Sequence, residues 1–153
     1  MITRPIIPMG NDIGFLPGSI REKLDPWIQP LKDNLMVLTK GNAQSMLHLM
    51  ERWVEVEALT FIRGRSLPRR FFIIDEAQNL SPSEVKTIVT RMGEGSKIVF
   101  TGDLQQVDTN RSERSSNGLS YLITKMLNEP LAAHIHLQKS ERSTLAARAA
   151  EIL

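Results

Sequence analysis

The chain has 153 residues, with 19 lysines and arginines against 17 aspartates and glutamates, so its formal charge is +2. This length suits one compact domain, and 41% hydrophobic with 24% charged residues is typical of a soluble globular protein. The absence of cysteine excludes disulfides, thiolate zinc sites and cysteine nucleophiles. The sequence shows neither a secretory signal pattern nor an apolar run of about 20 residues, so we expect a cytoplasmic protein without a membrane partner.

Short apolar runs rich in β-branched residues alternate with helical patterns along the chain. This alternation predicts an α/β fold in which helices pack on a parallel sheet. A further short, half-exposed strand is expected around Val54 to Ala58, where apolar residues alternate with glutamates. The four main predicted strands are Ile2 to Ile7, Phe71 to Asp75, Ile98 to Thr101 and His134 to Gln138.

Helix signals fill the segments between these strands. Ser19 and Glu22 have capping-box spacing and predict a helix that Pro26 and Pro30 should kink or interrupt. The clearest start is Ser81 to Glu84, where a capping serine, a proline and a glutamate predict a helix running to about Met92. Further helices are expected over 117–128 and from 143 to the end of the chain, and a helix after Asn42 should bury Met46, Leu47, Met50 and Trp53.

Two carboxylates, Asp75 and Glu76, follow directly on the most apolar predicted strand. In open α/β sheets, ligands bind beyond the carboxyl ends of the strands, which is where these acids should lie. Adjacent acids suit nucleotide hydrolysis, because one can hold a hydrated magnesium ion while the next deprotonates an attacking water. The alternative is that both acids simply leave the strand into solvent.

A second strand end has the same design. The predicted strand over 98–101 runs into Gly102 and Asp103, and two glutamines follow, the second of them Gln106. Glycine allows a sharp turn at a strand end, and a glutamine there can accept from a water and donate to a phosphate oxygen. The alternative is a plain connection between a strand and a helix.

Five segments of the chain carry recognisable motifs, at residues 2–18, 61–67, 73–80, 101–108 and 137–143. Taken together, they resemble the PhoH family of P-loop ATPases, which is related to superfamily 1 helicases. The likeness extends over nearly the whole chain, and domain 1–153 is therefore interpreted as part of such an ATPase domain.

The resemblance implies roles for particular residues. Asp75 and Glu76 would be the Walker B pair, with Asp75 as the magnesium ligand and Glu76 as the general base. Gln106 matches the glutamine of the helicase Gly-Asp-x-x-Gln motif that senses the terminal phosphate, which places Asp103 in the nucleotide site as well. Arg142 is similar to a helicase arginine that neutralises charge on the transferred phosphate. ATP and magnesium are the implied cofactors.

The chain departs from the family pattern in one respect. It contains no phosphate loop of the form G-x-x-x-x-G-K-[ST], and Gly93 to Lys97 has the wrong spacing and precedes a strand. We therefore expect a three-layer, RecA-like parallel sheet that is truncated at its N-terminus, so that the Walker A strand and helix are absent. This departure makes ATP hydrolysis by the chain alone uncertain.

Arginines concentrate around the predicted loop that contains Arg63 and Arg65, which continues to Arg69 and Arg70. This cluster could contact single-stranded RNA, enter the nucleotide site of a neighbouring subunit in a homo-oligomer, or form a solvated loop. Thr3 and Arg4 occupy a place similar to a strand-binding motif of helicases and are the other candidates for RNA contact.

The leading hypothesis is thus a PhoH-like fragment whose intact relatives hydrolyse ATP and act on RNA. A rival from a different class is a non-catalytic remnant that binds nucleic acid or a partner subunit. A second rival is an artificially shortened copy of a competent enzyme.

Overall fold

The computed structural model describes residues 1–3, 20–56, 59–62, 64–104, 106, 117–138 and 143–152. The chain forms two compact units, Met1–Leu122 and Ile123–Leu153. The first unit holds the sheet and most of the helices, and the second holds the end of one helix, a described segment without regular structure and the C-terminal helix. No helix in these residues combines the length and apolarity that a membrane crossing requires.

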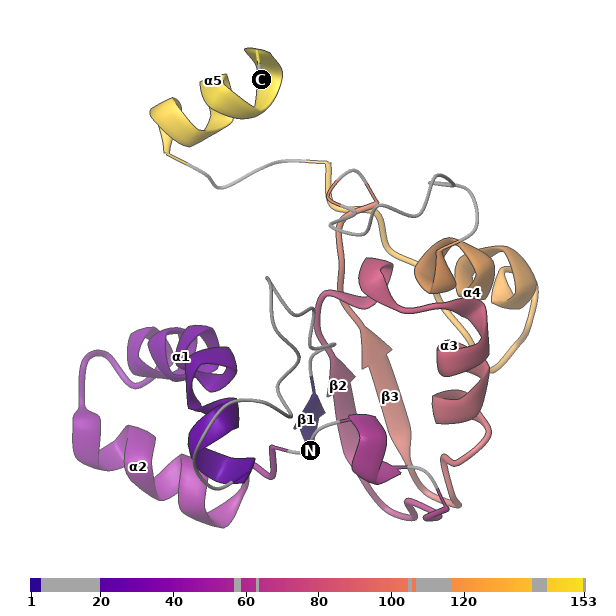
Figure 1. Ribbon diagram of the computed structural model, residues 1–153, viewed down its shortest axis with the longest axis horizontal. Coiled ribbons are helices and arrows are strands. Elements are labelled where there is room, and N and C mark those ends of the chain that lie inside the picture. The colour runs from indigo at the N-terminus through magenta and orange to yellow at the C-terminus, as the bar shows by residue number, and fades with distance from the viewer. Residues whose placement is uncertain are drawn as a thin grey trace. The chain divides into compact units, whose positions relative to one another are not determined.

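Three parallel strands form the sheet, confirming the predicted α/β class. They are β1 (Ile2–Thr3), β2 (Phe71–Ile74) and β3 (Lys97–Phe100), with β2 in the centre, as Figure 1 shows. In the register of the sheet, Ile73 lies opposite both Ile2 and Val99. Because the strands are parallel, the residues that follow β2 and β3 emerge at the same edge.

The core collects around one face of β2 and the helix that follows it. Phe72 and Ile74 are completely buried, whereas Phe71 at the start of the strand is exposed. The helix α3 (Pro82–Val89) contributes Val85 and Ile88 to this core. Other buried apolar side chains belong to η2 (Leu59–Ile62), η3 (Ala77–Asn79) and α4 (Gly118–Met126).

The predicted start of α3 is confirmed in detail. The Ser81 hydroxyl accepts from the Glu84 amide, and the Glu84 carboxylate accepts from the Ser81 amide at 2.8 Å, which completes a capping box. The helix ends at Val89, earlier than expected, and a turn leads to Gly93. Gly93 packs against Pro68 so closely that a Cβ atom would lie 2.9 Å from the Pro68 backbone.

Two further helices precede the core. The helix α1 (Ile20–Leu38) is continuous, so Pro26 and Pro30 do not interrupt it, and of the two predicted outcomes only a kink is left. Ser19, its predicted cap, lies outside the described residues. The helix α2 (Ala43–Arg52) begins after Asn42, whose side chain accepts from the Ser45 amide, as predicted.

The expected burial of the α2 side chains is also wrong. No residue of α2, all of which is described, is buried, and 54% of Leu47 and 74% of the following Trp53 are exposed. The apolar pattern of this segment does match a helix. However, the part of the chain that the structure describes covers little of its apolar face, since α2 contacts mainly α1 there.

The segment after α2 joins the sheet beside β1. The amide of Ile2 donates to the Glu55 carbonyl at 2.8 Å, and Val56 forms a single parallel bridge with Ile2. The predicted strand over 54–58 is thus reduced to one bridge in its described part. The predicted strand at Ile2 to Ile7 is described only as far as Thr3.

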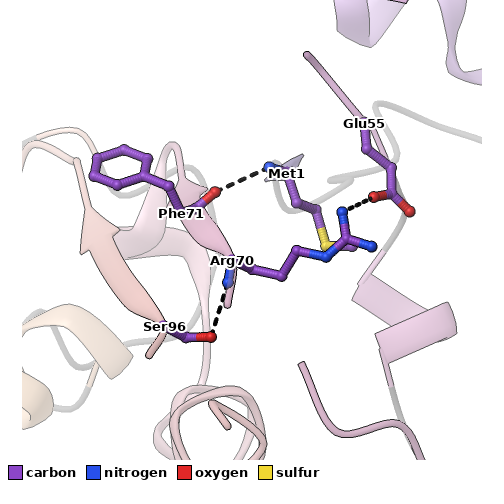
Figure 2. Close-up of polar contacts among 5 residues, drawn as sticks. All are labelled: Met1, Glu55, Arg70, Phe71 and Ser96. Atoms are coloured by element: carbon purple, nitrogen blue, oxygen red, sulfur yellow. Dashed lines mark hydrogen bonds and ion pairs between the residues drawn. The ribbon is translucent and has the colours of Figure 1, made fainter. Parts of the chain in front are cut away.

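An ion pair and two backbone contacts surround this junction (Figure 2). Arg70 donates to the Glu55 carboxylate at 2.7 Å, and its amide donates to the Ser96 hydroxyl at 2.9 Å. The Met1 amino group donates to the Phe71 carbonyl at 2.9 Å, which aligns β1 on β2. Burial lowers the pKa of this amino group; the Glu55 carboxylate raises it and the Arg70 guanidinium lowers it.

In the second unit, the predicted strand at His134 to Gln138 is wrong. Residues 132–138 form no regular structure, and 79% of Ile135 and 85% of Leu137 are exposed. A strand requires hydrogen bonds to a neighbour, and no described strand pairs with this segment. The C-terminal helix α5 (Thr144–Ile152) forms as predicted.

Candidate functional site

The site lies where the chain leaves β2 and β3. The Thr101 amide donates to the Ile74 carbonyl at 2.8 Å, and the Ala77 amide donates to the Thr101 carbonyl at 2.9 Å, so the two exits are joined by backbone hydrogen bonds. The Thr101 hydroxyl donates to the Asp75 carboxylate at 2.8 Å. These contacts place Asp75 beside the turn that follows β3, as the parallel topology predicts.

Glu76 follows Asp75 with an unusual backbone conformation. Its φ of 54° and ψ of 40° lie in the left-handed region, which disfavours residues with a Cβ atom by about 1 kcal/mol or more. Such strain is concentrated at functional positions, where surrounding contacts maintain it. Here the Glu76 carboxylate accepts a hydrogen bond of 2.7 Å from the Gln78 side chain.

Gln78 connects this bend to the turn after β3. Its amide nitrogen also donates to the Gln106 carbonyl at 3.0 Å, and its amide oxygen accepts from the Asp103 amide at 3.2 Å. Only 1% of Gln78 is exposed, whereas Asp103 and Gln106 lie at the surface. The Gln106 side chain in turn donates to the Asp103 carboxylate at 3.0 Å. The residues around Asp75 and Glu76 and those around Asp103 and Gln106 thus share one hydrogen-bonded network.

Glycine was expected at position 102 because it allows a sharp turn, but the structure gives a different reason for it. Its φ is not positive, so the turn does not need glycine for its backbone conformation. A Cβ atom at this position would instead clash with the Gln78 amide oxygen and lie 3.0 Å from Leu119. Glycine lets the turn after β3 approach Gln78 closely.

Other predicted site residues are placed less completely. Arg142, Arg4 and Arg63 lie outside the described residues. Thr3 is described: it is 1% exposed, and its carbonyl accepts from the Asp75 amide at 3.0 Å. Because Thr3 is buried, its side chain is not available for the RNA contact that the sequence suggested.

The described arginines of the basic cluster differ from one another. Arg65 and Arg69 are exposed, and Arg69 has a left-handed backbone with a φ of 51°. Arg70 pairs with Glu55, but both side chains are more than a third exposed, so this pair contributes little stability. The described part of the cluster therefore combines one arginine that is paired with a carboxylate and two whose residues are exposed.

The sequence by itself does not single out Gln78. The residue belongs to the motif at 73–80, in which only the two acids have assigned roles. Its position in the sequence is the one indication of a role: Gln78 is a polar residue two positions after Glu76, in a segment that must be buried against the next strand exit. Only the tertiary structure shows that its side-chain amide contacts three groups at once.

Comparison with known proteins finds relatives that match the whole length of the chain. The chain is 48% identical to Protein PhoH2 of Bacillus subtilis (strain 168) over 156 residues, covering 100% of the chain and 35% of that relative. It is 42% identical to Protein PhoH2 of Mycolicibacterium smegmatis over 154 residues, again covering 100% of the chain and 35% of the relative. It is 40% identical over 126 residues to the PhoH-like protein of Synechocystis sp., covering 82% of the chain and 38% of that protein.

The chain thus spans about a third of the length of these relatives. The sequence pattern of the PhoH-like protein family matches all of residues 1–153. The strand exits, their acids and their glutamines all fall inside the matched region. This chain belongs to the PhoH-like protein family.

Proposed function

We propose that this chain carries the magnesium and water side of an ATP-hydrolysing site. The observation that supports this proposal is that hydrogen bonds join the two strand exits. The Thr101 hydroxyl lies 2.8 Å from an Asp75 carboxylate oxygen, and Gln78 links the Glu76 carboxylate to the backbone of Asp103 and Gln106. Carboxylates and an amide side chain gathered at the carboxyl ends of parallel strands are the groups that a phosphate-bearing ligand and its cation require.

The residues at this edge fit a magnesium ion. Asp75 and the adjacent Thr101 hydroxyl offer hard oxygen ligands, which magnesium prefers. Among the described residues no group of three or more histidine or acidic side chains forms a metal cage. A magnesium ion in a nucleotide site is instead held by one or two protein oxygens together with phosphates and waters. When bound, the ion would neutralise negative charge on the phosphates.

Each side chain then has a defined task. Asp75 orients the hydrated cation, and Glu76 accepts a proton from the attacking water. Gln106 and Asp103 form the part of the rim that meets the terminal phosphate. The role of Arg142 on the transferred group stays an expectation from the family resemblance. A cradle for the other phosphates must come from a phosphate loop, a motif that these 153 residues do not contain.

RNA is the second partner of the proposal. Arg65 and Arg69 are exposed on the described part of the basic cluster, and the neighbouring Gly64 is exposed as well. Exposed guanidinium groups suit contacts to a phosphate backbone. Coupling of ATP hydrolysis to RNA is proposed for the intact protein.

The proposal is tested by titrating the 15N-labelled chain with Mn²⁺·ATP. Paramagnetic broadening should concentrate on the amides of residues 75–78 and 101–103. Asp75→Asn should remove most of this effect, because a neutral amide is a weaker ligand for the cation.

Asp33→Asn is the matched control, since Asp33 lies on α1 and accepts from Gln29 at 2.9 Å. This variant should respond as the wild type does. Broadening that is equal in Asp75→Asn and the wild type would contradict the assignment of Asp75. The absence of any response to Mn²⁺·ATP would favour the non-catalytic binding protein.

A further inference from the structure

Gln78 is a buried amide whose polar atoms are all engaged in the site. Its nitrogen donates to the Glu76 carboxylate at 2.7 Å and to the Gln106 carbonyl at 3.0 Å, and its oxygen accepts from the Asp103 amide at 3.2 Å. With 1% of the residue exposed, water cannot replace these partners readily. The side chain therefore depends on both strand exits at once.

The partners also determine the orientation of the amide. Two of them, a carboxylate and a carbonyl, can only accept, and the third, a backbone amide, can only donate. Rotating the Gln78 amide by 180° would place its oxygen beside the two acceptor oxygens and its nitrogen beside the Asp103 amide, which is a donor. One orientation satisfies all three groups, so neither glutamate nor methionine can reproduce the full set of contacts.

The contacts join the two parts of the site that have different tasks. Glu76 has a left-handed backbone, and Gln78 binds its carboxylate through the same nitrogen that binds the carbonyl of Gln106. A shift of either partner therefore changes the hydrogen bonds available to the other. Gly102 leaves the space that this arrangement needs, because a Cβ atom there would clash with the Gln78 oxygen.

We propose that Gln78 is the positioning residue of this site, holding the Glu76 carboxylate and the turn of Asp103 and Gln106 in one arrangement. This inference rests on the proposed function, in which Glu76 activates water and Gln106 meets the terminal phosphate. Gln78 touches neither the water nor the phosphate. It aligns the residues that do.

The first test requires no nucleotide. In spectra of the 15N-labelled chain, the side-chain amide of Gln78 should exchange its hydrogens with water roughly tenfold more slowly than that of Gln29, which is also hydrogen-bonded but exposed. Gly102→Ala should shift the Gln78 signals and abolish this difference, because the added methyl group displaces the amide. Equal exchange of the two glutamines in the wild type would overturn the inference.

The second test uses Gln78→Met, which keeps the length of the side chain but removes its hydrogen bonds. The Asp103 amide should exchange several-fold faster, while the Thr101 amide, bonded to the Ile74 carbonyl, stays protected and reports an intact fold. Gln29→Met is the matched control and should change neither amide. Unchanged exchange of the Asp103 amide in Gln78→Met would show that Gln78 only fills space.

Adding Mg·ATP separates this inference from the proposed function. In the wild type, the nucleotide should shift the amide signals of both Glu76 and Asp103; in Gln78→Met the shift at Asp103 should be lost. A protected Gln78 amide in a wild-type chain that ignores Mg·ATP would refute the proposed function and support the positioning contacts. Equal shifts at Asp103 in both proteins would refute the role of Gln78 and support the nucleotide site.

Discussion

At the scale of single residues, small and polar side chains decide how closely the strand exits approach. Gly102 leaves space for the Gln78 side chain. Gly118, at the start of α4, leaves space for Val85 and the Leu80 carbonyl, from which a Cβ atom would lie only 2.6 Å and 2.8 Å away. The Gly118 amide donates to that carbonyl. These glycines are needed because other atoms occupy the space of a Cβ atom.

Glu76 carries the residue-scale prediction for catalysis. Any release of phosphate from Mg·ATP by the chain should fall by about 100-fold or more in Glu76→Gln, because an amide cannot accept a proton from the attacking water. Binding of Mn²⁺·ATP should persist in this variant. Phosphate release and nucleotide binding are measured in parallel on the same preparation.

The control for this prediction is Glu94→Gln, which changes an exposed glutamate in the turn before β3. Its phosphate release should equal that of the wild type. Hydrolysis that survives unaltered in Glu76→Gln would exclude Glu76 as the base.

At the scale of elements, locally capped helices were predicted well, whereas elements that need distant partners were not. The capping box at Ser81 and Glu84 is visible in the sequence because all its atoms lie within four residues. The run at His134 to Gln138 has strand-like residues, but a strand also needs a neighbour, which no described residue provides. Local pattern alone could not reveal that difference.

The two helix caps should differ in their effect on stability. Ser81→Ala should lower the free energy of unfolding by about 1 kcal/mol, because α3 packs Val85 and Ile88 into the core and loses its cap. Asn42→Ala removes the cap of α2. Because α2 buries no residue, this substitution should lower the free energy of unfolding by less than half as much. Urea unfolding followed by circular dichroism measures both. Equal losses would indicate that α2 is as strongly coupled to the core as α3.

At the scale of the whole molecule, the chain has two compact units and several exposed apolar side chains. The sheet and the hydrogen-bonded strand exits lie within Met1–Leu122. The described part of the basic cluster, at Arg65, Arg69 and Arg70, belongs to the same unit. The described strand exits and the described arginines of the basic cluster thus belong to one unit of the chain.

Binding of a single-stranded oligouridylate tests this arrangement. Affinity should fall as salt concentration rises, and replacing Arg63 and Arg65 with glutamine should reduce the slope of log affinity against log salt by about 1.4. Replacing Lys40, in the turn after α1, and Arg52, at the end of α2, with glutamine makes the same charge change and should leave the slope nearly unchanged. Fluorescence anisotropy over a salt series gives both slopes. A flat response in the wild type would argue against RNA contact.

The sequence by itself determined the parallel α/β class, the family, the main helix starts and the acids and glutamines that follow β2 and β3. These features follow from periodicity, caps and motif spacing, all of which are local. Only the tertiary structure decided that Gln78 joins the two exits, that Gly102 serves close approach, and that Leu47 and Trp53 are exposed. Those outcomes depend on which atoms meet between residues far apart in the chain, or on whether anything covers an apolar face, and no local pattern encodes either.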